Sequence, residues 1–228
     1  MKPDVVLLVQ DEAPDLDAGE FTRWLTGMDA AIRGRAESGV PCGDCNACCR
    51  SRYFIEIKPS DAAARRRIPA ALIFDAPGAP AGYQVLGYDG EGRCPMLKGG
   101  VCSIYEDRPA TCRTYDCRMF AATGIAEPGA DKADVTARAA RWRFHYHSAE
   151  GIDQHRLLQA GTRALLRMVA DDAITGPASA SQLAMLAIRL FPVFTELGER
   201  LGPADDGVSE IVRDRIQAAL PALRSEGP

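Results

Sequence analysis

The sequence has little that would assign it to a large functional class by composition alone. Its 228 residues carry a net charge of −4, so no broad positive surface for nucleic acid is expected. No stretch reaches the roughly 18 apolar residues that a membrane-spanning helix requires. The chain shows no glycine-rich nucleotide motif, no phosphate loop and no Ser/His/Asp set. These absences leave a globular protein whose chemistry must come from another feature.

The beginning of the sequence also lacks the pattern of a secretory leader. The apolar run from Val5 to Val9 is short, acidic residues follow it at once, and no small-residue cleavage site stands behind it. We therefore expect a cytoplasmic protein in a reducing environment. Disulfides rarely persist in such a compartment, so cysteines in this chain need another role.

Histidine, a common metal ligand, occurs only three times. His145, His147 and His155 lie close together in the sequence, beside Trp142. His145 and His147 are two positions apart and would not share one face of a helix. We expect these side chains to be surface or packed aromatic groups rather than ligands.

What the chain does have is eight cysteines, all placed between residues 42 and 117. A chain of this length can bury an adequate core without cross-links, so cysteine staples are not required. Buried apolar thiols remain a simpler alternative, because free cysteine is readily buried. Clustering at the spacing of metal ligands nevertheless favours metal binding.

The first cysteine segment reads Cys42-Gly-Asp-Cys45-Asn-Ala-Cys48-Cys49. Two intervening residues allow the chain to turn so that both sulfurs face one metal at about 2.3 Å. A third cysteine at the same interval is typical of bacterial iron–sulfur proteins. We expect Cys42, Cys45 and Cys48 to share a site, and Cys49 to point away from Cys48 toward a second site.

The second cysteine segment supplies Cys94, Cys102, Cys112 and Cys117. Cys94 precedes a proline, as the remote ligand of a ferredoxin-type cluster often does. The Lys98-Gly99-Gly100 turn should fold Cys102 back toward Cys94. Sulfur-only sites select zinc or iron–sulfur clusters over metals that prefer oxygen, so the residues alone leave both metals open.

Taken together, the two segments resemble the YkgJ-type cysteine-cluster family, which is described as a zinc- or iron-chelating domain. The resemblance runs from residue 42 to 120 and includes the Arg108-Pro109 step between the last two pairs of cysteines. It implies metal chelation by Cys42, Cys45, Cys48, Cys49, Cys94, Cys102, Cys112 and Cys117. Flagellin lysine methylases have a similar cysteine cluster of iron–sulfur type and use S-adenosylmethionine, which favours iron here.

Two arginines of the same signature, Arg108 and Arg113, are candidate cofactor-binding residues. In a functional interpretation they donate hydrogen bonds to cluster sulfurs or thiolates and tune the metal. In a structural interpretation Arg108 caps a turn or pairs with Glu106 or Asp107. The sequence leaves both interpretations open.

The predicted fold is α+β and mostly helical, with a small turn-rich cysteine module and a C-terminal helical bundle. We predict an N-terminal strand and helix within 1–41, a metal-binding module at 42–120 and a helical region at 132–224, packed as one globular unit. The N-terminal helix follows from apolar residues at helical spacing, with Asp15 or Asp17 as its cap: Phe21, Trp24, Leu25, Met28 and Ile32.

Within the module we predict a strand near 53–57, a helix near 60–67, a loose hairpin from Tyr83 to Leu97 and a helix from Pro109. Beyond it, three apolar faces predict helices. The first comprises Leu157, Leu158, Leu165, Met168 and Val169; the second Leu183, Leu186, Leu190, Phe191 and Phe194; the third Ile211, Ile216, Leu220 and Leu223.

The function predicted from these observations is metal binding by a cysteine cluster. The centre is expected to be an iron–sulfur cluster, [4Fe–4S] in type, with zinc as the alternative. The protein would act in redox, delivery or assembly work with a protein partner, without nucleic acid or membrane. The alternative is an iron–sulfur-assisted enzyme that modifies a protein side chain, such as an S-adenosylmethionine-dependent lysine methylase.

Overall fold

The computed structural model describes residues 5–9, 13–175, 179–201 and 208–225, and these form two compact units. The helical unit comprises Met1–Glu37, Cys117–Pro128 and Ala139–Pro228, and the cysteine unit comprises Ser38–Asp116 and Gly129–Arg138. Nine α-helices and nine short strands occur in the described residues, so the mostly helical α+β class is confirmed. The N-terminal segment thus joins the C-terminal helices in one unit.

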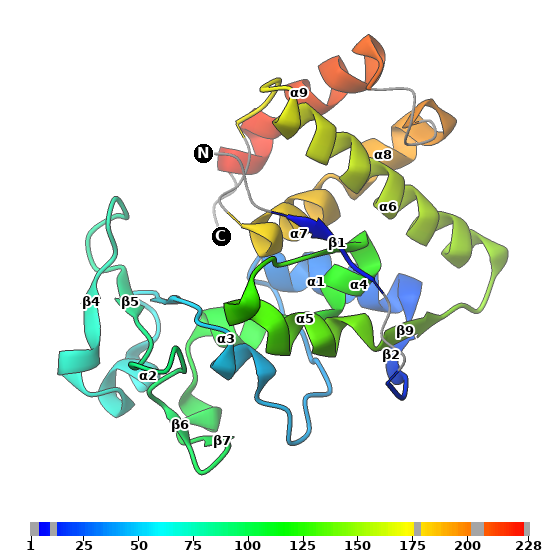
Figure 1. Ribbon diagram of the computed structural model, residues 1–228. Helices are drawn as coiled ribbons and strands as arrows, with labels where there is room; N and C mark the ends of the chain where they lie inside the picture. The colour runs from blue at the N-terminus through cyan, green and yellow to red at the C-terminus, as the bar shows by residue number, and fades with distance from the viewer. Residues whose placement is uncertain (1–4, 10–12, 176–178, 202–207, 226–228) are drawn as a thin grey trace. The chain divides into compact units, whose positions relative to one another are not determined.

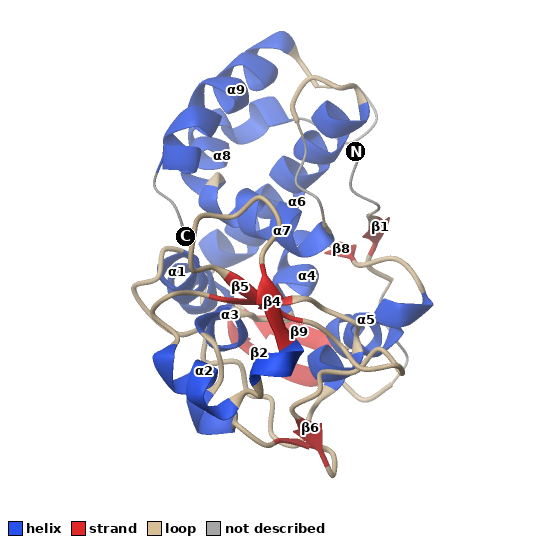
Figure 2. Cartoon of the chain, turned by 90° about the vertical axis from the view of Figure 1, so that its left-hand side faces the viewer, coloured by secondary structure: helices blue, strands red, loops and turns tan. Residues whose placement is uncertain are grey.

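In the helical unit, a parallel pair of strands leads into two helices. Strand β2 (Leu16–Glu20) pairs with β9 (Trp142–His145), and helix α1 (Phe21–Ile32) follows β2 directly. The long α6 (Ala149–Ala170) follows β9 (Figure 2). A second, antiparallel pair is formed by β1 (Val6–Leu7) and β8 (Ile125–Ala126).

Helix α1 confirms the predicted apolar face, because Phe21, Trp24, Leu25 and Met28 are all buried. The prediction that Asp15 or Asp17 caps its N-terminus was wrong. The carboxylate of Glu20 accepts hydrogen bonds from the backbone N–H groups of Thr22 and Arg23, at 3.2 and 2.7 Å. Asp17 instead accepts the Gly19 N–H at 2.8 Å, because β2 continues past it as far as Glu20.

Four further helices build the rest of this unit. They are α4 (Arg118–Thr123), α7 (Ala180–Arg189), α8 (Phe191–Leu197) and α9 (Glu210–Ser225). The long α6 contacts three of them, α4, α7 and α8 (Figure 1). The second predicted apolar face is divided between α7 and α8, since Pro192 stands in the first turn of α8. In the third, Ile216 is buried as predicted, whereas Ile211 is 62% exposed and its neighbour Val212 is buried instead.

No single helix in the described ranges is long and apolar enough to cross a membrane. The segments Ala180–Arg189 and Phe191–Leu201 meet the length and composition test only when they are taken together, and they are bent by 58° at their junction. Their Leu183, Ile188 and Phe194 are buried in the core of the helical unit.

The cysteine unit contains a small antiparallel sheet in the order β3-β5-β4, formed by Ile55–Ile57, Gln84–Leu86 and Ile73–Asp75 (Figure 2). Helix α2 (Ala62–Arg67) and helix α3 (Ala110–Thr114) lie where helices were predicted. The unit's hydrophobic core is small and consists of Ile57, Ala64, Ile68, Leu86, Met96 and Ile104.

The predicted hairpin between Tyr83 and Leu97 is wrong. Strand β5 pairs with β3 and β4, while β6 (Leu97–Lys98) pairs with β7 (Val101–Cys102). The chain turns too early for the predicted pairing, because the Asp89 N–H donates to the Arg93 carbonyl at 2.8 Å and closes a tight loop. The partners of β5 therefore precede it in the chain, the neighbouring β4 and the more distant β3, and the pattern of β5 alone does not reveal them.

A glycine in α6 should be indispensable to the helical unit. A Cβ atom built at Gly161 would overlap the ring of Phe194, which is fully buried. We expect Gly161→Ala to lower the free energy of unfolding by about 1–3 kcal/mol through overpacking. Gly27→Ala is the matched control on α1, where the new Cβ meets nothing within 4 Å. It should raise stability by about 0.5–1 kcal/mol, as alanine does in a helix interior. Thermal denaturation of both variants tests this, and equal melting temperatures would contradict it.

Candidate metal centre

The first cysteine segment is a compact succession of turns. The Cys45 N–H donates to the Cys42 carbonyl at 2.9 Å, and Gly43 between them has a φ of +56° that favours glycine. Cys48 and Cys49 follow in the short 3₁₀-helix Ala47–Arg50. This geometry confirms the tight turning expected of a C-x2-C sequence.

The second segment is bound to the first through its backbone. The Cys94 N–H donates to the Cys49 carbonyl at 2.7 Å, which places the two cysteines side by side. The β6–β7 hairpin then pairs Leu97 with Cys102, so the turn returns Cys102 toward Cys94 as predicted. Asn46 adds a further tie, because its side-chain amide donates to the Gly100 carbonyl at 2.9 Å.

Cys112 is presented by helix α3, which Asp61 holds in place. One carboxylate oxygen of Asp61 accepts the Ala110 N–H and the other accepts the Lys58 N–H, both at 2.9 Å. Thr111 also donates its hydroxyl to the Glu56 carbonyl at 2.9 Å, which fixes α3 against β3. Sequence analysis missed Asp61, although an aspartate directly before a helix is a recognisable capping signal.

The pKa shifts of the thiols are consistent with the backbone contacts between the two cysteine segments. Burial raises the pKa of Cys112 strongly, and the charges of Cys48, Cys94 and Cys102 raise it further. Burial likewise raises the pKa of Cys94, and Cys102 and Cys48 add to this effect. These effects agree with the backbone contacts that bring Cys94 and Cys102 beside the first cysteine segment.

Cys48 stands at the middle of this group. The thiol of Cys49 hydrogen-bonds to it and raises its pKa well above the usual value, and burial adds to the rise. Burial, followed by the charges of Cys48 and Cys45, raises the pKa of Cys42 to about 11. The expectation that Cys49 points away from Cys48 toward a second site stays a prediction. Successive side chains of a 3₁₀-helix are rotated by about 120°, less than in a strand, so adjacent thiols can meet.

The two candidate arginines differ in their surroundings. Arg108 lies 3.9 Å from the centre of the Tyr105 ring, and its positive charge lowers the pKa of both Cys42 and Cys112. Arg113 lies 3.8 Å from a carboxylate oxygen of Asp61 and donates a hydrogen bond to the Arg108 carbonyl. Arg108 thus acts on the thiols electrostatically, while Arg113 helps to position α3 and the residue before it.

Cys117, the last of the eight, belongs to the helical unit and stands immediately before α4. Its sulfur accepts a hydrogen bond from the indole N–H of the buried Trp142 at 3.2 Å. The histidines behave as packing or surface groups. His155 stacks on Phe21 with ring centres 4.3 Å apart, and His145 lies 3.3 Å from Asp17.

All eight cysteines are free thiols. Within the described part of the chain, no three cysteine, histidine, aspartate or glutamate side chains are placed so that they would hold one metal ion. The four convergent thiols are therefore electrostatic neighbours that lie outside ligating geometry. Their chemistry is entirely sulfur, which suits zinc or iron rather than magnesium or calcium.

A lysine outside the predicted module binds the backbone directly after the first cysteine segment. Lys132 donates to the carbonyls of Ser51 and Arg52, at 2.6 and 2.9 Å, and lies 4.4 Å from the centre of the Tyr53 ring. The Ser51 hydroxyl accepts the Val135 N–H at 3.2 Å. Sequence analysis missed this contact, because Lys132 follows the last cysteine and lies in no motif.

Metal binding at these thiols should release protons. The pKa values of Cys42, Cys48, Cys94 and Cys112 are raised, so these groups are protonated at neutral pH and must ionise in order to bind metal. We expect zinc affinity to rise with pH between mildly acidic and mildly alkaline conditions, by about tenfold per pH unit for each proton released. Calorimetric titration in buffers of different ionisation enthalpy measures the number of protons released when the metal binds. Binding without proton release would contradict the assignment of thiols as ligands.

Comparison with known proteins agrees with this geometry. Residues 41–138 match the model of the CxxCxxCC family, whose description is "Putative zinc- or iron-chelating domain". The matched range contains all eight cysteines and also the Gly129–Arg138 segment, which packs in the cysteine unit. No curated protein and no solved structure matches the chain. Residues 41–138 are therefore similar to the cysteine-cluster domain that this family model describes.

Proposed function

We propose that the cysteine unit binds an iron–sulfur cluster of the [4Fe–4S] type through its thiolates, and that the protein uses it in redox, delivery or assembly work. The observation that carries the proposal is the backbone contact between the two cysteine segments: the Cys94 N–H donates to the Cys49 carbonyl at 2.7 Å, and the β6–β7 hairpin returns Cys102 toward Cys94. Four thiolates are the number that one such cluster, or one zinc ion, requires.

The cysteine sulfurs are suitable ligands for a soft metal. The turns that carry them also allow the sulfurs to move into ligating positions. Cys42 and Cys45 lie in a loop without helix or strand, and Gly99 and Gly100 form the tip of a two-residue hairpin. Small rotations in these turns would bring sulfurs inward without disturbing the small core. A bound cluster would supply one-electron chemistry or transferable iron.

The residues around the thiols have distinct tasks in this proposal. Arg108 favours thiolates by lowering the pKa of Cys42 and Cys112. Asn46 holds the first segment against the hairpin, and Asp61 fixes the helix that carries Cys112. Sulfur ligands with a positive neighbour are typical of metal-binding thiolates.

Iron is proposed over zinc because the C-x2-C-x2-C spacing is typical of iron–sulfur proteins. A reducing compartment such as the cytoplasm would suit this centre, because thiols persist there. No contact within the described residues specifically favours a lysine methylase activity over this role.

The identity of the bound metal distinguishes an iron–sulfur cluster from zinc. We expect protein purified without oxygen to be brown, with iron, acid-labile sulfide and broad visible absorption. Cys48→Ser and Cys112→Ser should each lose colour and iron, because serine oxygen is a poor ligand for this metal. Arg66→Asn, an exposed position on α2 of the same unit, is the control and should keep both. Colourless protein with stoichiometric zinc and no sulfide would replace iron by zinc, and full iron in Cys112→Ser would overturn the ligand assignment.

A further inference from the structure

Three exposed aromatic side chains form a contiguous cluster on the cysteine unit. Phe54, Phe74 and Tyr88 are 60%, 45% and 37% exposed. The ring centre of Phe54 lies 6.2 Å from that of Phe74 and 4.9 Å from that of Tyr88. The three rings therefore pack on one another at the surface and not in the core. A contiguous apolar patch of this kind marks interaction sites on soluble proteins. We call these three residues the aromatic triad.

The small sheet explains why the aromatic triad faces outward. Alternate residues of a strand point to opposite faces, so Ile57 and Leu86 enter the core while Phe74 points away from it. Gly87 provides room for this arrangement, since a Cβ there would stand 3.4 Å from the Phe74 ring. The exposed face is thus produced by the same strand register that builds the core.

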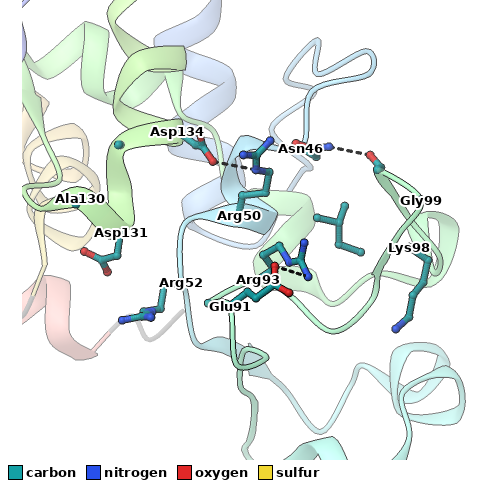
Figure 3. A pocket seen from close by; sticks show the side chains of 14 residues that line it. Asn46, Arg50, Arg52, Glu91, Arg93, Lys98, Gly99, Ala130, Asp131 and Asp134 are labelled. Atoms are coloured by element: carbon teal, nitrogen blue, oxygen red, sulfur yellow. Dashed lines mark hydrogen bonds and ion pairs between the residues drawn. The ribbon is translucent and has the colours of Figure 1, made fainter.

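A cationic cavity adjoins the aromatic triad. It has a volume of about 1020 Å³, and the basic residues that line it are Arg50, Arg52, Arg93 and Lys98 (Figure 3). Arg50 pairs with Asp134 at 3.0 Å, and Arg93 pairs with Glu91 at 2.8 Å. Within the described ranges, Arg52 and Lys98 form no ion pair. Two positive charges in the lining are thus left for an external partner.

Arg52 connects the cavity with the aromatic triad. Its guanidinium carbon lies 5.4 Å from the centre of the Tyr88 ring, while its side chain also lines the cavity. Gly92 makes this position possible, because a Cβ there would stand 2.8 Å from the Arg52 Nε. The backbone of Arg52 has a φ of +46°, a conformation that is uncommon outside glycine.

The surface is held rigidly before any partner arrives. Asp89 accepts the N–H groups of Glu91 and Arg93, both at 2.9 Å, and so fixes the loop that runs from Tyr88 to the cavity. The Arg52 N–H donates to the Gly92 carbonyl at 3.1 Å. A rigid surface loses less conformational entropy on binding, so it suits recognition better than a mobile one.

We propose that the aromatic triad and the cationic cavity form one docking surface for an acidic polypeptide segment of a partner protein. An aromatic or aliphatic side chain of the segment would pack on the triad, and its carboxylates would pair with Arg52 and Lys98. Nucleic acid fits less well, since Glu91, Asp131 and Asp134 line the same cavity and repel a continuous row of phosphates. A polypeptide can instead place single carboxylates at the two available cations.

The location gives the docking surface a role in the proposed function. Arg50 directly follows Cys49, and Arg93 directly precedes Cys94. A partner seated there would lie beside two cysteine segments, where it could receive or deliver a metal centre. This role rests on the proposed function, whereas the docking itself rests only on the surface.

The docking is tested by measuring the fluorescence anisotropy of synthetic peptides that carry a neutral dye. Each peptide is titrated with the full chain after metal reconstitution. The probe alternates aspartate with tryptophan and leucine, and the matched peptide carries asparagine at each aspartate. We expect the acidic peptide to bind at least about tenfold more tightly than the asparagine peptide. Arg52→Asn and the double variant Phe54→Ser, Phe74→Ser should each weaken binding by about tenfold. Asparagine tolerates the backbone conformation at position 52, so this variant should fold.

Two controls make the test specific. Arg66→Asn removes an exposed arginine of α2, and Ile211→Ser removes an exposed apolar side chain of α9; both should leave binding unchanged. Equal affinity for the two peptides, no loss in Arg52→Asn, or tighter binding of oligothymidine would overturn the proposal. Metal content is measured in every variant. Peptide binding by protein without iron or zinc would refute the proposed function alone, and full metal without peptide binding would refute the docking alone.

Discussion

Thiols that lie close together oppose one another's ionisation, because the thiolates would repel, and so the raised pKa values keep Cys42, Cys48, Cys94 and Cys112 protonated until a metal binds. The charges of Cys48, Cys94 and Cys102 each oppose ionisation of Cys112, and burial opposes it further. Water cannot relieve the repulsion at a buried sulfur, whereas a shared metal cation can. Among the described residues, the main hydrophobic cluster of the unit is small and comprises six buried apolar side chains. A metal centre would therefore relieve the repulsion and join segments that otherwise depend on a few backbone hydrogen bonds.

The contacts that bring the thiols together also shape the surface beside them. The bond between the Cys94 N–H and the Cys49 carbonyl aligns the two cysteine segments, and Arg93 and Arg50 are their direct neighbours. Lys132 reinforces the same region by binding the Ser51 and Arg52 carbonyls. The position of Arg52 at the edge of the cavity is thus a consequence of the packing behind the cysteines.

Local sequence patterns predicted the local structure well. Helix α1 follows from its apolar spacing, α3 from Pro109, and the return of Cys102 from its glycine turn. Cysteine spacing favours sulfur ligation, since few other roles need that pattern, and this ligation stays a prediction. Contacts between distant segments were not predictable, as the partners of β5 and the reach of Lys132 show. Such contacts depend on tertiary packing, which leaves no periodic signal in one sequence.

The central claim is that sulfur alone surrounds the metal of this protein. X-ray absorption at the metal edge, recorded on protein purified without oxygen, measures that first shell directly. The account predicts about four sulfur neighbours per metal, with further iron atoms beyond them if the centre is an iron–sulfur cluster. A first shell made up mainly of oxygen or nitrogen would contradict it.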